Sequence, residues 1–325
     1  MDVPSSTAET LLARVTEYLE IEPRDQATLR FLARGVYHEN YVFSSGPTEY
    51  LVRVNLSSQL GLSHEAQAQY EFNTLKDVAA SSVTPQPIAL ISGENESNKS
   101  ILIEEFVHGR EFDYRVDLTA AAESLASIHR CVPNFNSAMV RANAGEALRA
   151  DGIRWMLLAE QLGSEGTSLR ILKELSTSLV NDKPSKWHGI VHTDLTHSNF
   201  IVNTRCYLVD WECARFAGIE WDLAHFVART TTMWSASRSY CYSEAEVEHF
   251  LTAYADAAGI RERELLGILV RNLLPLIYFR CFAWCAGTHA LHERGLVTPL
   301  REHDANRLRH YLAPEFIQQF FVTEE

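Results

Sequence analysis

Three polar residues lie at a spacing that suits the transfer of a phosphoryl group. His192-Thr193-Asp194 is followed by Asn199 and, eleven residues further on, by Asp210. A carboxylate can accept the proton of an attacking hydroxyl. Mg²⁺ prefers oxygen ligands and takes only one or two of them from the protein beside nucleotide phosphates. We therefore predict that Asp194 is a catalytic base, that Asn199 and Asp210 hold magnesium, and that His192 braces the loop through hydrogen bonds.

The segments around these residues must bring them together. Gly189–Val191 is a short apolar run, which predicts a strand that enters the loop. Phe200–Val202 and Tyr207–Val209 predict two further strands with a polar turn between them. Such a hairpin would place Asn199 and Asp210 at the same end of the ribbon.

This segment resembles the aminoglycoside phosphotransferase/choline kinase family, whose loop reads H-G-D-x-x-x-x-N and is followed by a strand ending in I-D-W/F. Here Thr193 replaces the glycine, and the strand ends in Val209-Asp210-Trp211. Trp221-Asp222-Leu223-Ala224 matches the family's W/Y-D-L-A, and its aspartate is expected to brace the loop as well. The resemblance implies an α+β, two-lobe, protein-kinase-like fold. A small lobe with an antiparallel sheet would cover residues 1–104, and a large, mainly helical lobe over 105–325 would carry the catalytic loop, the metal site and the acceptor site.

A second stretch is expected to cover the nucleotide phosphates. Phe31–Phe43 predicts a strand, a turn and a strand. The family has a short G-x-x-x-N loop here, and this chain has a similar, more widely spaced pair, Gly35 and Asn40. The resemblance implies that backbone N–H groups of this loop contact the phosphates of ATP or GTP, whereas the residues alone favour an ordinary hairpin turn. The chain has no G-x-x-x-x-G-K-[ST], which excludes a P-loop.

A cation and a carboxylate complete the expected nucleotide site. Tyr50–Val54 predicts a strand, on which the resemblance places the cation that contacts the α- and β-phosphates. That residue is Arg53 rather than the usual lysine, so the charge is kept and a bidentate fork is gained. Ser63–Ala79 has apolar residues at helical spacing. Glu71 on this helix is expected to hold Arg53, with Glu65 as the rival.

The segment Ile103–Gly109 resembles the hinge between lobes. In the family the hinge backbone contacts adenine, and the resemblance places these contacts on Glu104 and Phe106. The side chains of Glu104 and Glu105 are expected to face solvent or to be structural. Two short strands, Ile88–Ile91 and Ser100–Ile103, are predicted just before the hinge.

The rest of the chain predicts helices. His129 lies in an L-A-x-x-H stretch, and we expect a buried histidine with a hydrogen-bonded ring. Pro275 should kink or divide the apolar helix Leu265–Ala290, and 306–321 is expected to be helical. The aromatic residues of this part allow a cage for a quaternary ammonium or ordinary core packing. They are Trp234, Tyr240, Tyr242, Tyr278 and Trp284.

Composition narrows the class of protein. The chain has 325 residues, 46% of them hydrophobic, and a formal net charge of -13. It has no Lys/Arg run, which argues against nucleic acid and anionic membrane surfaces as partners. Its N-terminus is polar and acidic, which is unlike a signal peptide. The sequence has no uninterrupted run of about 18 apolar residues, so we expect no membrane span. The six cysteines form no C-x-x-C and suit a reducing, cytoplasmic compartment.

These features predict an ATP- or GTP-dependent kinase that phosphorylates a hydroxyl of a small molecule. An aminoglycoside or another antibiotic is the first choice of acceptor. Choline, an amino alcohol or a metabolic sugar is the alternative. A nucleotide-binding pseudokinase scaffold is a further class, which the complete set of Asp194, Asn199 and Asp210 disfavours. The net charge does not distinguish between these acceptors. Residues 1–104 carry a net charge of -7 and the remainder carries -6, so the acidic excess is not concentrated in the lobe that would bind the acceptor.

Overall fold

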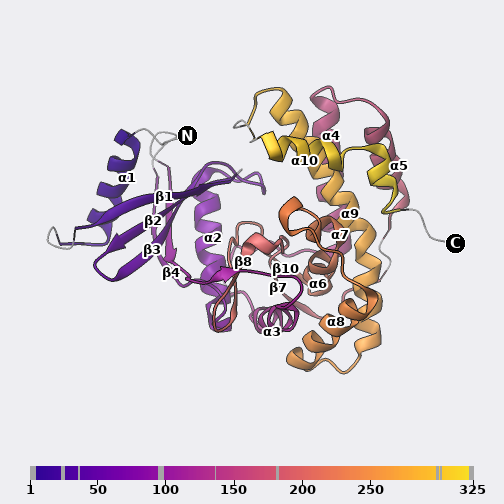
Figure 1. Cartoon of the computed structure of the whole chain (residues 1–325), viewed down its shortest axis with the longest axis horizontal. Coiled ribbons are helices and arrows are strands. Elements are labelled where there is room, and N and C mark those ends of the chain that lie inside the picture. Colours follow the sequence, from indigo (N-terminus) through magenta and orange to yellow (C-terminus); the bar gives the residue numbers. More distant parts are fainter. Residues whose placement is uncertain are drawn as a thin grey trace. The chain divides into compact units, whose positions relative to one another are not determined.

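The computed structural model describes residues 5–22, 26–35, 37–93, 99–135, 137–180, 183–297, 300 and 302–321 (Figure 1). The chain forms two compact units, each assembled from separate stretches. Unit 1 comprises Met1–Phe112, Cys131–Met139 and Asn199–Ala214. Unit 2 comprises Asp113–Arg130, Val140–Ser198 and Arg215–Glu325. The expected lobes, 1–104 and 105–325, are each one continuous stretch of chain. The two units of the structure instead alternate along the chain.

Unit 1 is built on a five-stranded sheet in the order β1-β2-β3-β5-β4, in which all neighbours are antiparallel. Its strands are β1 (Thr28–Arg34), β2 (His38–Ser45), β3 (Thr48–Asn55), β4 (Pro87–Ile91) and β5 (Ile101–Glu105). A smaller sheet has the order β6-β8-β9, with β6 (Arg110–Glu111), β8 (Phe200–Val202) and β9 (Cys206–Leu208). The helices are α1 (Ser5–Tyr18), α2 (His64–Val78) and the short η2 (Ala79–Ser81). The small lobe with an antiparallel sheet is therefore confirmed.

The two faces of the large sheet differ in chemistry. One face packs Val52, Ile101 and Ile103 with Leu11 and Val15 of α1 into a buried apolar cluster. Side chains alternate between faces along a strand. The opposite face therefore receives Arg53 of β3, which lies directly across from Asn40 of β2 and Leu102 of β5.

Two later stretches of chain join unit 1 through buried polar contacts with α2. Asp77 accepts hydrogen bonds from the backbone and side chain of Asn134 and, at 2.7 Å, from Ser137 Oγ. From the second stretch, the backbone oxygen of Ala214 accepts from the Tyr70 hydroxyl at 2.5 Å. The backbone oxygen of Glu212 likewise accepts from Gln67 Nε2 at 2.9 Å. Residues 131–139 and 199–214 thus complete this unit.

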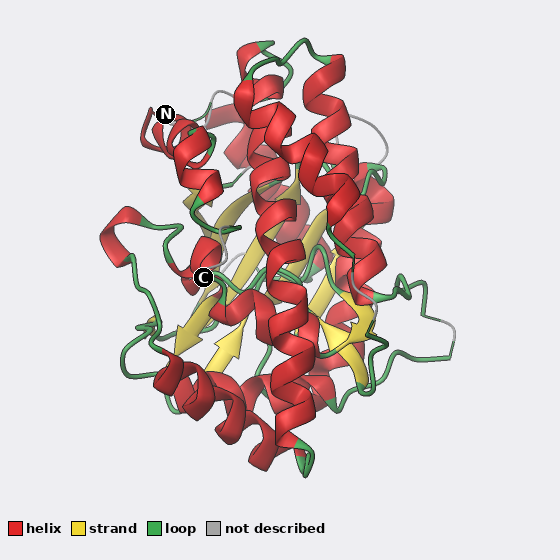
Figure 2. Cartoon of the chain, turned by 90° about the vertical axis from the view of Figure 1, so that its right-hand side faces the viewer, coloured by secondary structure: helices red, strands yellow, loops and turns green. Residues whose placement is uncertain are grey.

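Unit 2 is mainly helical, as the red segments of Figure 2 show. Its helices are α3 (Leu118–His129), α4 (Ala144–Gln161), α5 (Thr167–Ser178), α6 (Glu220–Val227), α7 (Arg229–Thr232), α8 (Glu244–Ala258), α9 (Arg263–Glu293), α10 (Glu302–Tyr311) and α11 (Pro314–Gln318). Short 3-10 turns are η3 (His197–Asn199), which reaches the unit boundary, and η4 (Ala236–Arg238). A two-stranded antiparallel sheet pairs β7 (His188–Val191) with β10 (Arg215–Gly218).

The structure narrows the expectation for Pro275. Of a kink or a division, it excludes the division, because α9 runs unbroken from Arg263 to Glu293. Packing of Phe279 and Phe282 into the core of this unit offsets the lost backbone hydrogen bond. The tail is helical as expected and forms two helices, because Pro314 begins α11 at a position where proline has no N–H to satisfy.

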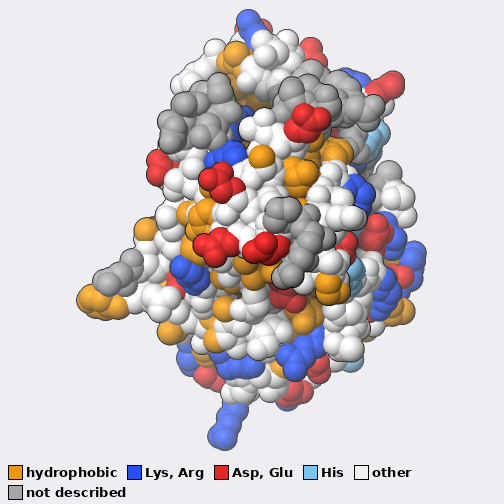
Figure 3. Space-filling model, turned by 90° about the vertical axis from the view of Figure 1, so that its left-hand side faces the viewer, with side chains coloured by type: hydrophobic (Ala, Val, Ile, Leu, Met, Phe, Trp, Pro, Cys, Tyr) orange, Lys and Arg blue, Asp and Glu red, His pale blue; other side chains and the backbone are white. Residues whose placement is uncertain are grey.

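α9 also has the length and apolar composition of a membrane-spanning helix. Half of its most apolar 18-residue stretch is buried inside the protein, and a helix of the protein core can have the same length and composition. On the face of the molecule that Figure 3 shows, the described side chains are a mixture of acidic, basic and apolar ones.

Candidate active site

The loop with His192 and Asp194 follows a strand that is fixed by close packing. β7 pairs with β10, from Val191 opposite Arg215 to His188 opposite Gly218. At Gly189 a Cβ atom would lie 2.5 Å from the backbone oxygen of His129, so only glycine fits this position.

The backbone of the loop is strained and is held by a carboxylate. Thr193 has a φ of 71°, in the left-handed region that β-branched residues rarely adopt. This conformation explains the glycine of the related family at this position. Asp222 of α6 accepts from the N–H of His192 at 2.7 Å and from the N–H of Thr193 at 2.8 Å. The contact predicted for Asp222 is therefore present.

His129 and Tyr254 support Asp222 from behind. His129 Nε2 lies 3.2 Å from Asp222 Oδ2, and His129 Nδ1 lies 2.7 Å from the Tyr254 hydroxyl. His129 is the buried, hydrogen-bonded histidine that the sequence predicts. Burial alone would raise the pKa of Asp222, but the hydrogen bond from His129 and the charges of His129 and His192 hold that pKa below its usual value.

An aromatic group lies next to this loop within unit 2. The hydroxyl of Tyr114 accepts from the N–H of His197 at 3.1 Å. Burial raises the pKa of Tyr114, and the charge of Asp194 adds to the shift. The Tyr114 ring lies 6.4 Å from that of Tyr240 and 5.8 Å from that of Tyr242.

The aromatic residues named from the sequence do not form one cage. Tyr240 and Tyr242 are 5.3 Å apart and pack on Tyr114. Trp234 and Trp284 contact each other at 5.6 Å in the apolar core. Tyr278 packs on Phe320 at 4.9 Å. Of these five residues, Tyr240 and Tyr242 approach the loop with Asp194, through Tyr114.

In unit 1, Arg53 is buried between two carboxylates. Its Nη2 lies 3.0 Å from Glu71 Oε1 and 2.5 Å from Asp210 Oδ1. Burial alone would lower the pKa of Arg53, but the charges of Glu71 and Asp210 outweigh it and raise that pKa, so the guanidinium stays charged. Glu65, the rival to Glu71, is exposed to solvent. The expected ion pair between Arg53 and Glu71 is present.

The sequence did not single out His38, which is buried in the same network. His38 Nε2 lies 3.2 Å from Glu71 Oε2, and His38 Nδ1 lies 3.1 Å from Glu212 Oε2 and 3.2 Å from Arg53 Nη2. The sequence could have indicated this position, because side chains alternate between the faces of a strand. His38 is two residues before Asn40 and therefore shares its face.

The hairpin of β8 and β9 forms as predicted. Phe200 pairs with Leu208, and the N–H of Val209 donates to the backbone oxygen of Asn199 at 2.9 Å. Asn199 and Asp210 therefore lie at the same end of the ribbon. Their amide and carboxylate oxygens are hard donors of the kind that magnesium takes, and the Asp210 side chain is partly exposed, so this pair fits the ion.

A second set of donor atoms is less suited to a metal. His38, Asp210 and Glu212 place ligand atoms within 4.8 Å of one another. His38 already contacts Glu71, Glu212 and Arg53, so its ring nitrogens are engaged within the protein. We interpret it as an ion-pair network.

The remaining nucleotide-site candidates lie on or beside the sheet of unit 1. Gly35 follows β1, and its N–H donates to the backbone oxygen of His38 at 2.9 Å. Asn40 lies within β2, opposite Arg53. Glu104 lies within β5 between β3 and β4, whereas Phe106 follows the end of that strand.

The Glu104 side chain does not face solvent. It is 1% exposed, and its Oε1 has no hydrogen-bond partner among the described residues. Burial raises the pKa of Glu104 to about 8, although the charge of Arg53 opposes the shift.

This shift predicts a pH-dependent stability. Between the ordinary glutamate pKa and about 8, the folded protein keeps a proton that the unfolded chain loses, so stability falls as pH rises through this range. Glu104→Gln removes this fall. We expect the variant to gain on wild type between pH 5 and pH 8, by an amount on the order of a few kcal/mol. Thermal unfolding at several pH values measures it, with Glu105→Gln as the control. Parallel curves for wild type and Glu104→Gln would contradict the assignment.

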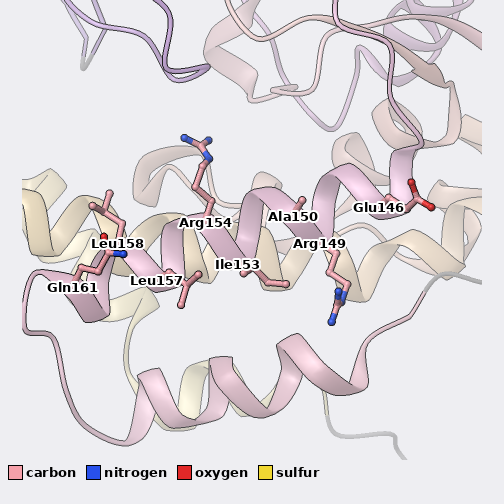
Figure 4. Close-up of a pocket in the computed structure, with 8 residues that line it drawn as sticks. All are labelled: Glu146, Arg149, Ala150, Ile153, Arg154, Leu157, Leu158 and Gln161. Carbon is pink, nitrogen blue, oxygen red and sulfur yellow. The ribbon is translucent and has the colours of Figure 1, made fainter.

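A pocket of about 740 Å³ lies along α4 in unit 2 (Figure 4). Its lining contains none of the residues that the sequence singles out for chemistry. Arg149, one of its lining residues, donates from Nε and Nη2 to the backbone oxygen of Ser176 in α5 at 3.0 and 2.6 Å.

Comparison with known proteins identifies the family of the chain and supports its fold. The sequence matches the phosphotransferase enzyme family over residues 28–268. No curated protein matches the chain in sequence.

Solved structures match at low identity over nearly the whole chain. A putative aminoglycoside phosphotransferase from Ralstonia eutropha is 15% identical with a TM-score of 0.65, over 96% of this chain and 98% of that one. Choline kinase LicA from Streptococcus pneumoniae is 17% identical with a TM-score of 0.64, over 97% and 100%. A spectinomycin phosphotransferase in complex with ADP and spectinomycin is 12% identical with a TM-score of 0.59, over 96% and 94%. These likenesses confirm the kinase-like fold.

Proposed function

Since the chain belongs to the phosphotransferase enzyme family and is a small-molecule phosphotransferase, we propose that it transfers the γ-phosphoryl group of ATP or GTP to a hydroxyl of an aminoglycoside or related antibiotic. The observation that carries the proposal is the buried guanidinium of Arg53, held by Glu71 and Asp210. Because the ion pairs already fix this side chain, it loses no further conformational entropy when it contacts nucleotide phosphates.

Each site residue has a distinct role in this proposal. Arg53 steadies the α- and β-phosphates, and Gly35 together with the first residues of β2, up to Asn40, covers them. The backbone of Glu104 and Phe106 contacts the base. Asn199 and Asp210 would hold Mg²⁺, which neutralises phosphate charge when bound.

Asp194 acts on the acceptor. Its carboxylate orients the attacking hydroxyl and takes its proton. His192 and Asp222 keep the loop in the conformation that presents it.

The Arg53–Glu71 pair can be tested as a unit. Arg53→Ala is expected to raise KM for the nucleotide by roughly 10-fold or more, since charge-assisted bonds are worth about 1.5–3 kcal/mol each. Glu71→Ala should act in the same direction by leaving the cation less firmly held. Because the two residues act together, the double variant should be little worse than either single one. Steady-state kinetics measure this, with the exposed Glu65→Ala as the matched control. Additive losses would mean that Glu71 does not act through Arg53.

An amino alcohol such as choline is the second candidate acceptor. The tyrosines beside the catalytic loop favour it, because aromatic faces attract organic cations. The guanidinium of Arg115 already lies 5.2 Å from the centre of the Tyr240 ring. The Tyr240 hydroxyl donates to the carboxylate of Glu246 at 2.5 Å, which adds negative charge at this place. The choline kinase among the solved structures agrees with this option.

An acceptor panel separates the candidates. ADP release would be followed with ATP or GTP, magnesium and one compound at a time: aminoglycosides, spectinomycin, a macrolide, choline, ethanolamine and hexoses. The proposal expects the highest kcat/KM on an aminoglycoside or related antibiotic. A preference for choline or ethanolamine would select the second candidate. If no hydroxyl compound stimulates ADP release, a nucleotide-binding scaffold is the better account.

We place the enzyme in the cytoplasm and expect neither nucleic acid nor membrane as a partner. All six cysteines are thiols in the structure, which suits a reducing compartment.

A further inference from the structure

The backbone just after the proposed base is held by a second side chain of α6. The N–H of Leu195, the residue after Asp194, donates to His225 Nδ1 at 3.1 Å. Both residues are buried, Leu195 completely and His225 to all but 7%. His225 comes three residues after Asp222 on the same helix, so both side chains lie on one face of α6.

The protonation state of His225 suits the role of acceptor. An imidazole nitrogen accepts a hydrogen bond only when it carries no proton. Burial lowers the pKa of His225 to about 3, with the charge of Arg280 as the next cause, so the ring is neutral at ordinary pH. The Thr231 hydroxyl lies 3.3 Å from the same nitrogen.

The two contacts enclose Asp194 along the chain. Before it, the N–H of Thr193 donates to Asp222 Oδ1 at 2.8 Å. After it, the N–H of Leu195 donates to His225. The N–H of Asp194 itself donates to His192 Nδ1 at 3.3 Å. Every backbone donor from His192 to Leu195 is therefore taken by a side chain.

Resting on the proposed function, we propose that His225 is a positioning residue for the phosphoryl transfer: by accepting the N–H of Leu195, it fixes the backbone after Asp194 as Asp222 fixes the backbone before it. A misplacement of a reacting group by about 1 Å can cost on the order of 10²-fold in rate. The loop also contains the strained Thr193, which would relax if one anchor were lost.

A pair of amide variants tests the contact. Asparagine can place its carbonyl oxygen close to the position of Nδ1, whereas the longer glutamine reaches toward that of Nε2. We expect His225→Asn to keep kcat within about 3-fold and His225→Gln to lose about 10-fold or more, with KM for the nucleotide nearly unchanged in both. Equal kcat in the two variants, whether normal or reduced, would overturn the proposal.

A double variant distinguishes positioning from general damage to the fold. If His225 acts through Asp194, adding His225→Gln to Asp194→Asn should cost little more than Asp194→Asn alone. Multiplied losses would mean that His225 only stabilises the fold, and the proposal would fall.

Amide hydrogen exchange gives a readout that needs no substrate. The N–H of Leu195 should exchange faster in His225→Gln than in wild type or His225→Asn. Unchanged protection in His225→Gln would overturn the proposal. A changed exchange rate together with full activity of Asp194→Asn would instead show that the contact exists and that the proposed catalytic role of the loop is wrong.

Discussion

Asp194→Asn is expected to lower kcat by a factor of about 10²–10⁴, the usual cost of removing a general base. The asparagine keeps the shape of the side chain and a hydrogen-bond acceptor but cannot take the proton of the hydroxyl. Asp222 and His225 hold the backbone of the loop, and asparagine keeps the size of the aspartate side chain, so the fold should survive the change. KM for the nucleotide should stay nearly constant, because the proposed phosphate contacts come from other residues.

Steady-state ADP release with saturating acceptor measures this effect. The exposed Asp256→Asn, on α8, is a matched control for a change of the same chemistry elsewhere. The Asp194→Asn variant should still bind its acceptor, which makes it a means of capturing an unidentified substrate by thermal shift. Near-normal turnover would show that this loop is not catalytic.

Asp210→Ala is expected to reduce turnover to background, by roughly 10³-fold or more, since a metal ion supplies several kcal/mol of charge stabilisation to a phosphoryl transfer. The same change removes one of the two carboxylates that contact Arg53, so thermal stability should also fall. Asp210→Asn should show both effects in a milder form, because the amide keeps the size of the side chain and an oxygen acceptor while removing the charge.

Turnover, nucleotide binding and thermal unfolding would be measured for both Asp210 variants. Wild-type enzyme in excess chelator should behave like Asp210→Ala in turnover but keep its stability. Full activity in chelator, or wild-type activity of Asp210→Ala, would exclude Asp210 as a metal ligand.

The features that sequence predicted best are local. The hairpin that brings Asn199 and Asp210 together follows from two apolar runs and a polar turn only a few residues apart. The pairing of Arg53 on a strand with Glu71 on a helix could be predicted only from the family resemblance. The structure decided between the two candidate glutamates, because Glu65 is exposed.

The features that sequence missed depend on distant parts of the chain. His38 meets Glu212 more than 170 residues later, and no periodicity in either segment reports that contact. Glu104 follows apolar strand residues, and alternation alone does not say which face of a strand is covered. The left-handed backbone of Thr193 was visible only as a departure from the family's glycine.

The interleaving of unit 1 sets an order of assembly during synthesis. The sheet and α2 are complete in the chain by Glu105, but Asp210 and the backbone acceptors of Tyr70 and Gln67 lie in 199–214. At a synthesis rate of about 5–20 residues per second, the 136 residues between Val78 and Ala214 take about 7–27 s to follow. During that interval Tyr70 and Gln67 on the buried side of α2 lack these partners. A nascent chain arrested before residue 199 should therefore be a good client for chaperones, and a fragment of residues 1–104 should fold poorly alone.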